Sequence, residues 1–473
     1  MTQHSIAIVG GGFSGLAVLA NLIFKAATPF SIYLIERSEN LAKGVAYSTS
    51  SLAHPLNVRA KSMGIFKDQP AHFWEWVKAH QDHPLISSIK SNPEAFLPRL
   101  VYGLYLEDLY QEIKKEAARK KITLTQIFDE AINASLLPSE KLALQLQTGR
   151  LLEVDFLVLA LGAPPAKRLP FESIELLEHE SYTANPWHPQ ERSILRDKPV
   201  LKNQKVLIIG SGLTTVDTIS SLAEHKIQGE IICISPRGTF PQIHQESSPQ
   251  NSISAYEVDD LPKTSLKLLK SIRNKILETE GNGGNWREVI DALRSCTQPL
   301  WHTLSIKEQK RFLTHLFSVW NSHRHRMAPA CALTIEHLRQ TGKFSMKQGR
   351  VMDIETIGPD KLRATIKTPT ETFPLLVDHV IKCTGPEYGV KDQHNPLLDH
   401  LHQKQLIEWD PLDLGLAVTP ECAVKGKVIG HIYALGALLF GAKFETTAVP
   451  DIREEADTIA TALLKKISSG LRC

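Results

Sequence analysis

The sequence carries one strand, turn and helix pattern twice, and this repeat limits the fold more than any other feature. Ile6–Val9 leads into residues 10–15, Gly-Gly-Gly-Phe-Ser-Gly, and Lys205–Ile209 leads into residues 210–215, Gly-Ser-Gly-Leu-Thr-Thr. A short apolar strand, a glycine turn and a helix start let a pyrophosphate approach the backbone and the N–H groups of the helix. One such turn is a weak signal. Two in one chain predict two bound dinucleotides and electron transfer between them.

The composition is that of an ordinary packed protein. The chain has 473 residues and a formal net charge of +3, which is negligible at this length, so we expect neither nucleic acid nor an anionic membrane as a partner. The absence of a cationic leader with an apolar core, and of a membrane-length apolar run, favours a cytoplasmic protein. Scattered cysteines without Cys-x-x-Cys spacing predict free thiols and no metal. The sequence gives no signal for the oligomeric state.

The first glycine turn is followed by a second expected strand, Ser31–Glu36. Glu36 lies about 20 residues beyond the turn, where an acid can accept hydrogen bonds from the adenosine ribose of a dinucleotide. The alternative is a structural glycine turn with a surface glutamate. Because a ribose carboxylate suits FAD and NAD equally, the choice between them needs other observations.

The second glycine turn is followed by the same order of elements as the first. Each turn is followed by a second strand, a β-meander and an apolar strand that ends at glycine; the meanders are residues 122–152 and 344–368, and the closing strands are Val154–Gly162 and Val377–Gly385. The offset from Asp155 to Gly162 equals the offset from Asp378 to Gly385. Matching elements in matching order indicate an internal repeat.

Two differences separate the second unit from the first. Thr215 replaces the third glycine, which normally allows close packing of helix on strand. The second strand ends without an acid, and Ser235 and Arg237 offer a hydroxyl and a guanidinium that suit the 2′-phosphate of NADP. The alternative is that Arg237 is a solvated turn residue.

The second unit also contains an insertion, about residues 256–342. Helices are expected at Pro262–Leu277, Trp286–Leu293 and Ile306–Trp320, the first with its proline in the opening turn. Residues 323–326 read His-Arg-His-Arg and can bind an anion or cap a helix end. The two histidines are spaced poorly for ligands on one helix face, so no metal is predicted.

A dithiol relay is not expected. A disulfide reductase of this architecture needs a cysteine pair shortly after the first nucleotide helix, and residues 40–48 contain no cysteine.

Eight short motifs, in order along nearly the whole chain, resemble the FAD/NAD(P)-binding family that includes the bacterial FAD-dependent urate hydroxylase. They are Gly10-x-Gly12-x-x-Gly15, Gly44-Val-Ala-Tyr47, Leu56-Asn57-Val58, Phe96-Leu-Pro98-Arg99-x-x-Tyr102-Gly103-x-Tyr105, Gly210-x-Gly212-Leu-Thr-x-Val-Asp217, Arg324-His-Arg326-x-x-Pro329, Cys383-Thr-Gly385-Pro386 and Glu445-Thr446-Thr-Ala-Val-Pro450-x-Ile-Arg453. A more distant similarity is to the flavin N-hydroxylating and Baeyer–Villiger monooxygenases.

The resemblance implies bound FAD, hydride from NADPH or NADH, capture of O2 as a flavin hydroperoxide, and transfer of one oxygen atom to a small-molecule substrate. Residues 154–162 resemble the second signature of two-dinucleotide flavoproteins, and Ile432–Gly436 resembles the strand that returns to the FAD domain. Residues 445–450 would then open the final helix, whose N–H groups can face the flavin pyrimidine. The return strand usually ends in Gly-Asp, whereas Ala437 follows Gly436 here.

The predicted site residues combine the motifs with this resemblance. The predicted FAD-binding residues are Gly10, Gly12, Phe13, Ser14, Gly15, Glu36, Arg37, Tyr47, Asn57, Arg99, Gly162, Gly436, Glu445 and Thr446. The predicted NAD(P)H-binding residues are Gly210, Gly212, Leu213, Thr214, Thr215, Ser235, Arg237 and Gly385. The catalytic candidates are His54, Asn57 and Arg59, and the alternative for each is local packing or turn chemistry.

We expect an α/β fold of two Rossmann-like three-layer dinucleotide-binding domains, the two-dinucleotide-binding flavoprotein architecture, with a helical insertion in the second. The predicted FAD-binding domain is discontinuous, residues 1–198 and 387–473, and the predicted NAD(P)-binding domain is residues 199–386. The leading hypothesis is an NAD(P)H-dependent flavin monooxygenase (hydroxylase) of a small polar molecule. The alternatives are an NAD(P)H:acceptor reductase without oxygen insertion and a non-catalytic FAD/NAD(P)-binding sensor.

Overall fold

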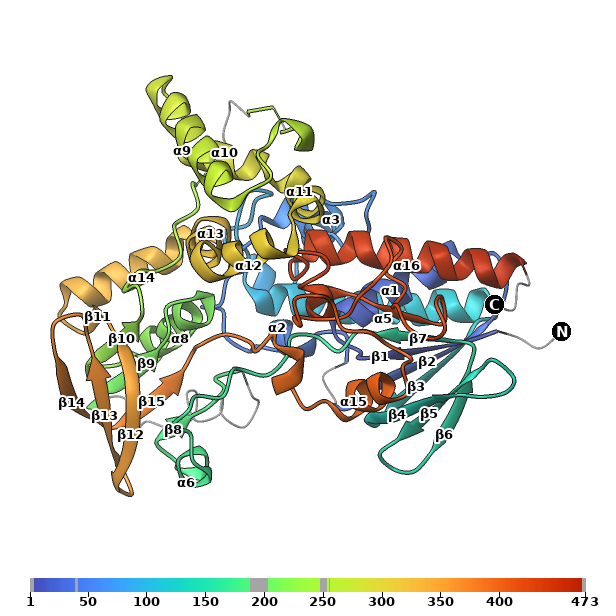
Figure 1. Cartoon of the computed structure of the whole chain (residues 1–473), viewed down its shortest axis with the longest axis horizontal. Coiled ribbons are helices and arrows are strands. Elements are labelled where there is room, and N and C mark those ends of the chain that lie inside the picture. Colours follow the sequence, from blue (N-terminus) through green and yellow to red (C-terminus); the bar gives the residue numbers. More distant parts are fainter. Residues whose placement is uncertain (1–3, 39–40, 188–202, 247–252, 255, 470–473) are drawn as a thin grey trace.

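The computed structural model describes residues 4–38, 41–187, 203–246, 253–254 and 256–469. The described elements form two parallel sheets, each with helices on one face and a small antiparallel sheet on the other (Figure 1). The predicted boundary between residues 198 and 199 lies outside the described residues.

The first sheet has the strand order β16-β7-β1-β2-β3, and every pairing in it is parallel. Its strands are β1 Ser5–Val9, β2 Ser31–Glu36, β3 Thr123–Phe128, β7 Phe156–Leu159 and β16 Ile432–Ala434. All residues of β1 and β7 are buried, as continuous apolar strands of a sheet covered on both faces must be. Helices α1 Phe13–Lys25, α5 Arg99–Arg119 and α16 Val449–Ser469 lie side by side over it.

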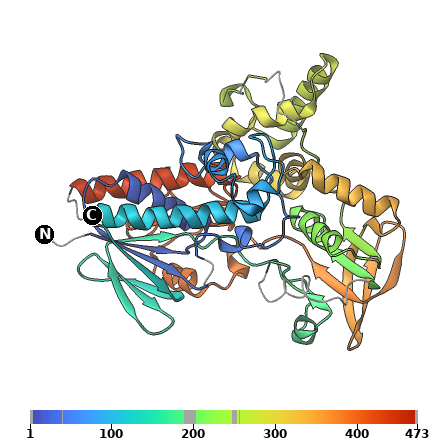
Figure 2. The ribbon, with the colours of Figure 1, turned by 180° about the vertical axis from the view of Figure 1, so that it is seen from behind.

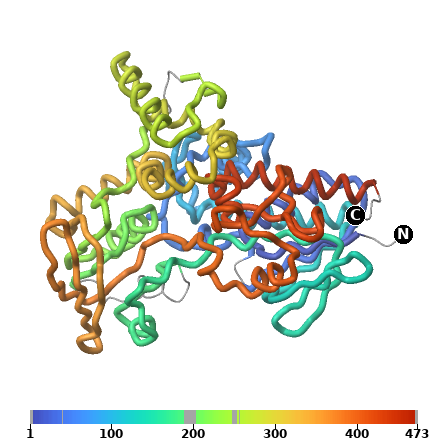
Figure 3. Tube along the Cα trace, viewed as in Figure 1, coloured from blue at the N-terminus to red at the C-terminus, as the bar shows by residue number. Residues whose placement is uncertain are grey.

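The C-terminal part of the chain therefore returns to the N-terminal sheet. Figure 3 shows this path, with the red C-terminal helix α16 beside the N-terminal helix α1. One apolar core joins them, from Ile6 and Leu16 at one end of the chain to Ile459 and Leu463 at the other.

The second sheet repeats the first, with the order β11-β10-β9-β15-β8 and parallel pairings throughout. Its strands are β8 Tyr182–Thr183, β9 Val206–Ile209, β10 Ile231–Ser235, β11 Phe344–Gln348 and β15 His379–Lys382. Helices α8 Leu213–Glu224 and α14 Pro329–Gln340 pack together on one face (Figure 2). Although β8 falls inside the range predicted for the first domain, it pairs with β15.

The repeat extends to single hydrogen bonds. Asp155 accepts a hydrogen bond from the Ser5 backbone N–H at 2.8 Å, and Asp378 accepts the matching one from the Lys205 backbone N–H at 2.7 Å. Each acid ties the strand after a meander to the start of the central strand. The matching offsets seen in the sequence therefore have a structural cause.

Each parallel sheet carries an antiparallel three-stranded sheet. The first is β4 Ala131–Leu136, β5 Leu142–Leu146 and β6 Leu151–Val154, and the second is β12 Arg350–Gly358, β13 Lys361–Lys367 and β14 Thr372–Val377. The shorter helices are α2 Gly44–Tyr47, α3 His72–Ala79, α4 Pro84–Ser87, α6 Ile174–Glu178 and α15 Pro396–Gln403. Single 3₁₀ turns are Ala60–Ser62, Val258–Asp260, Arg294–Cys296, Val390–Asp392 and Gly436–Leu439.

The insertion is helical as expected, but its helix boundaries differ from the prediction. Its helices are α9 Ser265–Gly281, α10 Trp286–Ala292, α11 Thr297–Thr303, α12 Ile306–His315 and α13 Phe317–Arg324. Pro262 lies before α9 rather than in its first turn, and the expected helix 306–320 is broken at Leu316. Helix α14, which falls in the insertion range, packs on α8 of the second sheet.

The insertion is anchored to the C-terminal segment rather than only to the second sheet. Trp301 stacks on Phe444 with ring centroids 4.6 Å apart, and its indole N–H donates to the Gly441 carbonyl at 2.8 Å. Figure 1 shows α9 and α10 projecting from the body of the molecule. Among the described helices, none combines the length and the apolar character needed to cross a membrane.

Candidate functional site

The first glycine turn packs so tightly that it excludes side chains. Gly10 follows β1 with a φ of +103°, and a Cβ there would lie 2.2 Å from the Ala160 carbonyl oxygen. A Cβ on Gly15 would lie 1.9 Å from the Gly10 carbonyl oxygen. These positions need glycine because backbone, which cannot swing away, occupies the space. The turn therefore brings β1, β7 and α1 together at the carboxyl end of the central strand.

The N-terminus of α1 has no side chain that caps it. Gly12 is the N-cap, and a Cβ on it would lie 3.2 Å from the Cα of Gly44, the first residue of α2. The first N–H groups of a helix have no partner within the helix, so those of α1 can meet an anion. The ring of Phe13 is buried against Tyr47 and Tyr102, at centroid distances of 6.0 and 6.1 Å, so Phe13 offers its backbone.

Glu36 lies at the end of β2, beside the glycine turn. One carboxylate oxygen accepts a hydrogen bond from the Gly11 backbone N–H at 2.8 Å, and the other accepts two from Ser38 at 3.0 Å. These bonds fix the carboxylate, which retains lone pairs for ribose hydroxyls. Arg37 next to it is exposed and lies 3.6 Å from Glu130.

The turn after β16 lies over the N-terminus of α1. Gly436 has a φ of +72°, and a Cβ on it would lie 3.4 Å from the Ser14 hydroxyl oxygen. Its backbone N–H donates to Glu455 of α16 at 2.8 Å, and Glu455 also accepts from the Thr446 hydroxyl. Gly162, after β7, has a φ of +76° and open space around the position of a Cβ.

Sequence reasoning missed Glu455. A signal was available, because Glu455 lies on the helix face that also carries the buried residues Ile452, Ala456 and Ile459. A carboxylate at such a position needs hydrogen-bonding partners inside the protein.

Glu445, which precedes α16, has a φ of +65° and contacts the helical insertion. Its carboxylate accepts hydrogen bonds from the Trp320 indole at 2.5 Å and from Arg324 at 3.1 Å. In the first turn of α16, Asp451 lies 3.6 Å from Arg294, and burial raises the pKa of this acid. The Arg-rich end of α13 is therefore tied to the start of α16.

Two of the other predicted residues lie where α8 of the second sheet meets the loops of the first. His54 is buried, and its two ring nitrogens lie 2.8 Å from the Thr49 hydroxyl and 2.6 Å from the Ser221 hydroxyl of α8. Arg99 lies 3.0 Å from Asp217 of α8, an ion pair rather than an aligned hydrogen bond. Burial raises the pKa of Asp217 to about 6, and the charge of Arg99 opposes this shift.

The remaining catalytic candidates also make contacts between the two halves. The Asn57 carbonyl lies 3.2 Å from the His244 Nε2 atom. Arg59 donates to the carbonyls of Glu94, Gln245 and Glu246 at 2.7 to 3.1 Å. Burial, followed by the charges of Arg326 and Arg59, lowers the pKa of His244 to about 3. The structure gives these residues docking contacts, and their predicted catalytic roles stay predictions.

The second glycine turn copies the first, with a more open helix start. Gly210 has a φ of +118°, and a Cβ there would lie 2.3 Å from the Cys383 carbonyl oxygen. Gly212 is the N-cap of α8 without a side-chain cap, and the position of its Cβ is open. Thr215 is fully buried at the place of the third glycine. Gly385 matches Gly162, with a φ of +85° and open space.

The other predicted residues of the second site lie around this turn. Leu213 packs against the core between α8 and the sheet, and the Thr214 hydroxyl lies 3.3 Å from the Trp187 indole nitrogen. Ser235 accepts a hydrogen bond from the Gly238 backbone N–H at 3.0 Å. Arg237 is exposed, and no carboxylate of the described residues pairs with it. The end of β10 thus presents an uncompensated cation.

The cysteines give no alternative redox centre. Cys233, Cys296, Cys331, Cys383 and Cys422 are buried free thiols, and Cys473 lies outside the described residues. Within the described ranges, no cluster of His, Cys, Asp and Glu is arranged to hold a metal.

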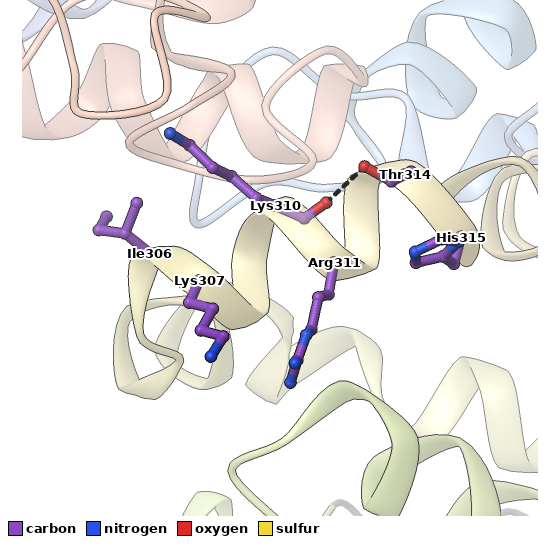
Figure 4. A pocket seen from close by; sticks show the side chains of 6 residues that line it. All are labelled: Ile306, Lys307, Lys310, Arg311, Thr314 and His315. Atoms are coloured by element: carbon purple, nitrogen blue, oxygen red, sulfur yellow. Dashed lines mark hydrogen bonds between the residues drawn. The ribbon is translucent and has the colours of Figure 1, made fainter.

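A hollow lies along α12, and all the residues that line it belong to this helix. Figure 4 shows the residues that line it, which are Ile306, Lys307, Lys310, Arg311, Thr314 and His315. Arg311 already pairs with Glu308 at 2.6 Å. The lining includes no residue of either glycine turn, so this hollow is not the candidate site.

Comparison with known proteins agrees with this geometry. Residues 7–164 match the FAD-NAD(P)-binding family. None of the curated proteins matches the sequence.

Solved structures of similar fold span nearly the whole chain. An ornithine N-hydroxylase from Kutzneria sp. 744 is 13% identical with a TM-score of 0.63, over 98% of this chain and 99% of that one. The L-lysine 6-monooxygenase of Pseudomonas syringae is 15% identical with a TM-score of 0.64, over 98% and 99%. The FAD-bound cadaverine monooxygenase of Erwinia amylovora is 13% identical with a TM-score of 0.61, over 100% and 96%. These likenesses confirm the predicted two-dinucleotide flavoprotein fold. The urate hydroxylase is not among these matches, and that finer resemblance stays a prediction.

Proposed function

We propose that this chain is an FAD-dependent oxidoreductase, and more specifically an NAD(P)H-dependent flavin monooxygenase that hydroxylates a small polar molecule. The observation that carries the proposal is the pair of equivalent glycine turns, each at the carboxyl end of the central strand of a parallel sheet. Ligands of open α/β sheets bind at these strand ends. Two equivalent sites in one chain fit a cofactor and the nicotinamide that reduces it.

The residues of the first site fit FAD. Gly10 and Gly15 allow close backbone contact, and the uncapped start of α1 supplies N–H groups for a pyrophosphate. Glu36 is held beside the turn, where it would bind the ribose. Gly162 and Gly436 would border the same space from β7 and β16.

The residues of the second site fit NADPH. Gly210 and Gly212 would take the pyrophosphate at the start of α8. Arg237, exposed and without a described carboxylate partner, would pair with the 2′-phosphate, since a guanidinium binds phosphate through two parallel hydrogen bonds. Ser235 would add a hydroxyl next to it.

Bound FAD would supply the redox chemistry of a monooxygenase, in which hydride from the nicotinamide and O2 give one oxygen atom to the substrate and the other to water. The protein would hold the two dinucleotides and exclude water. Residues 445 and 446 lead into α16, whose first N–H groups carry partial positive charge. These N–H groups would stabilise negative charge on the reduced flavin.

A small polar substrate is in keeping with the relatives of the same fold, whose names state ornithine, lysine and cadaverine. Their identity to this chain, 13 to 15%, does not transfer a substrate. The substrate is therefore to be found by screening small amines, amino acids and urate.

The test is purification without added cofactor, followed by addition of NADPH. The expected result is a yellow protein whose flavin absorbance bleaches with NADPH under anaerobic conditions. A folded, colourless protein that does not take up added FAD would contradict the proposal.

Oxygen insertion is tested separately with ¹⁸O2. A monooxygenase incorporates one labelled atom per NADPH consumed in the coupled reaction. Turnover of the true acceptor without O2 would instead assign the chain as an NAD(P)H:acceptor reductase. A bound flavin that NAD(P)H does not reduce would assign it as a sensor.

A further inference from the structure

A buried carboxyl group lies at the predicted flavin site and has no role in the function proposed so far. Glu455 is 3% exposed, in the second turn of α16. One carboxyl oxygen accepts a hydrogen bond from the Gly436 backbone N–H at 2.8 Å, and the other accepts one from the Thr446 hydroxyl. A buried acid costs free energy unless hydrogen bonds satisfy it, and here both oxygens are satisfied.

The two groups that Glu455 joins belong to different segments of the site. Gly436 opens the 3₁₀ turn that follows β16, and it lies against Ser14 at the start of α1. Thr446 is fully buried in the segment that leads into α16. Ala437 follows Gly436, so the turn has no polar side chain of its own at this point. Glu455 is the side chain that holds the two segments together.

The charge state of Glu455 depends on its burial, on its two hydrogen bonds and on two nearby charged side chains. Burial raises its pKa to about 7, while the hydrogen bonds from Gly436 and Thr446 and the charge of Lys443 lower it. Asp451 on the same helix raises it further, and Cys422 is the buried thiol nearby. The start of α1 contributes the uncharged Ser14. With a pKa of about 7, Glu455 is partly protonated at neutral pH, and the protonated form would donate to the Thr446 hydroxyl while still accepting from the Gly436 N–H.

We propose that Glu455 is a positioning residue of the FAD site, which fixes the Gly436 turn and the Thr446 segment around the bound flavin. This inference rests on the proposed function. Glu455 acts through the backbone of Gly436 and the hydroxyl of Thr446, and not by contact with the reacting atoms.

The contacts of Glu455, together with its raised pKa, lead to an expected dependence of FAD affinity on pH. The protonated acid adds no charge beside an anionic dinucleotide, whereas the ionised carboxylate repels it. FAD affinity is therefore expected to fall as the pH rises from 6 to 8, through the raised pKa of Glu455. The reverse trend would contradict a neutral Glu455 in the holoprotein.

The experiment compares Glu455→Gln with Glu455→Ala. Glutamine can accept from the Gly436 N–H and donate to the Thr446 hydroxyl, so it keeps both contacts without a titrating group. Alanine loses both. Glu454→Gln is the matched control, because Glu454 is half-exposed on the same helix and pairs with Lys67. The Kd for FAD and the absorbance spectrum of the bound flavin are measured for each apoprotein between pH 6 and 8.

Glu455→Ala is expected to raise the Kd for FAD by about tenfold or more and to change the flavin spectrum. Glu455→Gln is expected to bind FAD within about twofold of wild type at pH 6 and to lose the pH dependence, which Glu454→Gln keeps. If Glu455→Ala does not fold, the FAD affinity, flavin spectrum and pH profile of Glu455→Gln decide whether Glu455 acts at the FAD site. If both variants fold and keep the wild-type FAD affinity, flavin spectrum and pH profile, the role of Glu455 is overturned and the proposed function is not affected. A wild-type protein that does not bind FAD overturns the proposed function, and this inference with it.

Discussion

Single glycines set how closely backbone segments approach one another in the two proposed dinucleotide sites. Gly10 and Gly15 meet backbone atoms in the first turn, and Gly210 meets backbone in the second. Side chains then set the selectivity of each site. Glu36 at the end of β2 suits ribose hydroxyls, and Arg237 after β10 suits a phosphate.

Gly15→Ala is expected to abolish tight FAD binding. Its methyl group would lie 1.9 Å from the Gly10 carbonyl oxygen, so the turn must open. We expect a loss of about tenfold or more in FAD affinity, and a destabilisation of about 1 to 3 kcal/mol, typical of overpacking. Fluorescence titration and thermal unfolding measure the two effects. Gly281→Ala, at an exposed position with open space, is the control, and equal FAD binding by both variants would refute the role of Gly15.

Arg237→Ala is expected to raise the KM for NADPH by about tenfold, the loss of about 1.4 kcal/mol from one charged contact. The KM for NADH, which lacks the 2′-phosphate, should not change. Steady-state kinetics with both nucleotides measure this selectivity. Arg150→Ala, an exposed arginine on the meander of the first sheet, is the charge-matched control. If the variant keeps the wild-type preference for NADPH, Arg237 is a solvated turn residue that does not contact the 2′-phosphate.

At the scale of elements, the two ends of helix α8 have different roles. Its N-terminus lies at the proposed NAD(P)H site, and its later turns dock on the loops of the first sheet through Asp217, Ser221 and Glu224. Arg99, at the start of α5, and His54 meet it there. The helix therefore connects the second glycine turn, where we propose that NAD(P)H binds, to the loops of the first sheet.

Asp217→Ala is expected to destabilise the protein by about 3 to 5 kcal/mol, because it leaves the largely buried guanidinium of Arg99 without its carboxylate partner. Replacing both residues with apolar ones, Arg99→Met with Asp217→Leu, should cost less than the sum of the single changes. Denaturant unfolding of wild type, Arg99→Met, Asp217→Leu and the double variant gives the coupling free energy. Additive effects would show that the ion pair contributes nothing to docking.

At the scale of the whole molecule, the two sheets and the insertion meet around residues 241–246. Residues 243 and 327 pair as a β-bridge, and His244 lies 3.2 Å from the Asn57 carbonyl of the first half. Arg59 and Arg326 place positive charge beside His244. Protonation of His244 therefore disfavours the packing of the two sheets and the insertion against one another.

His244→Gln is expected to reduce the acid sensitivity of the fold. The folded pKa of His244, about 3, lies below its ordinary value of 6.5, so the unfolded chain binds a proton first. Stability must then fall as the pH drops from about 6.5 toward 3, by at most about 1.4 kcal/mol per pH unit from this group. Unfolding free energies between pH 7 and 5 should decline less steeply in the variant. The same slope in both proteins would exclude this contribution.

The sequence by itself determined the two dinucleotide units and their order. Continuous apolar strands followed by glycine turns depend on local backbone geometry, which is written in neighbouring residues, and the matching offsets of Asp155 and Asp378 marked the repeat. Helix boundaries in the insertion were less accurate, because packing onto the C-terminal segment decides where α12 ends and α13 begins.

Only the tertiary structure decided which side chains meet across the chain. Arg99 was expected at a flavin and pairs with Asp217, and His54 contacts Ser221. Glu455 lies among apolar residues of one helix, and its partners come from residues 436 and 446. Contacts of this kind depend on how distant segments pack, so no local pattern specifies them, whereas a glycine turn carries its geometry in six consecutive residues.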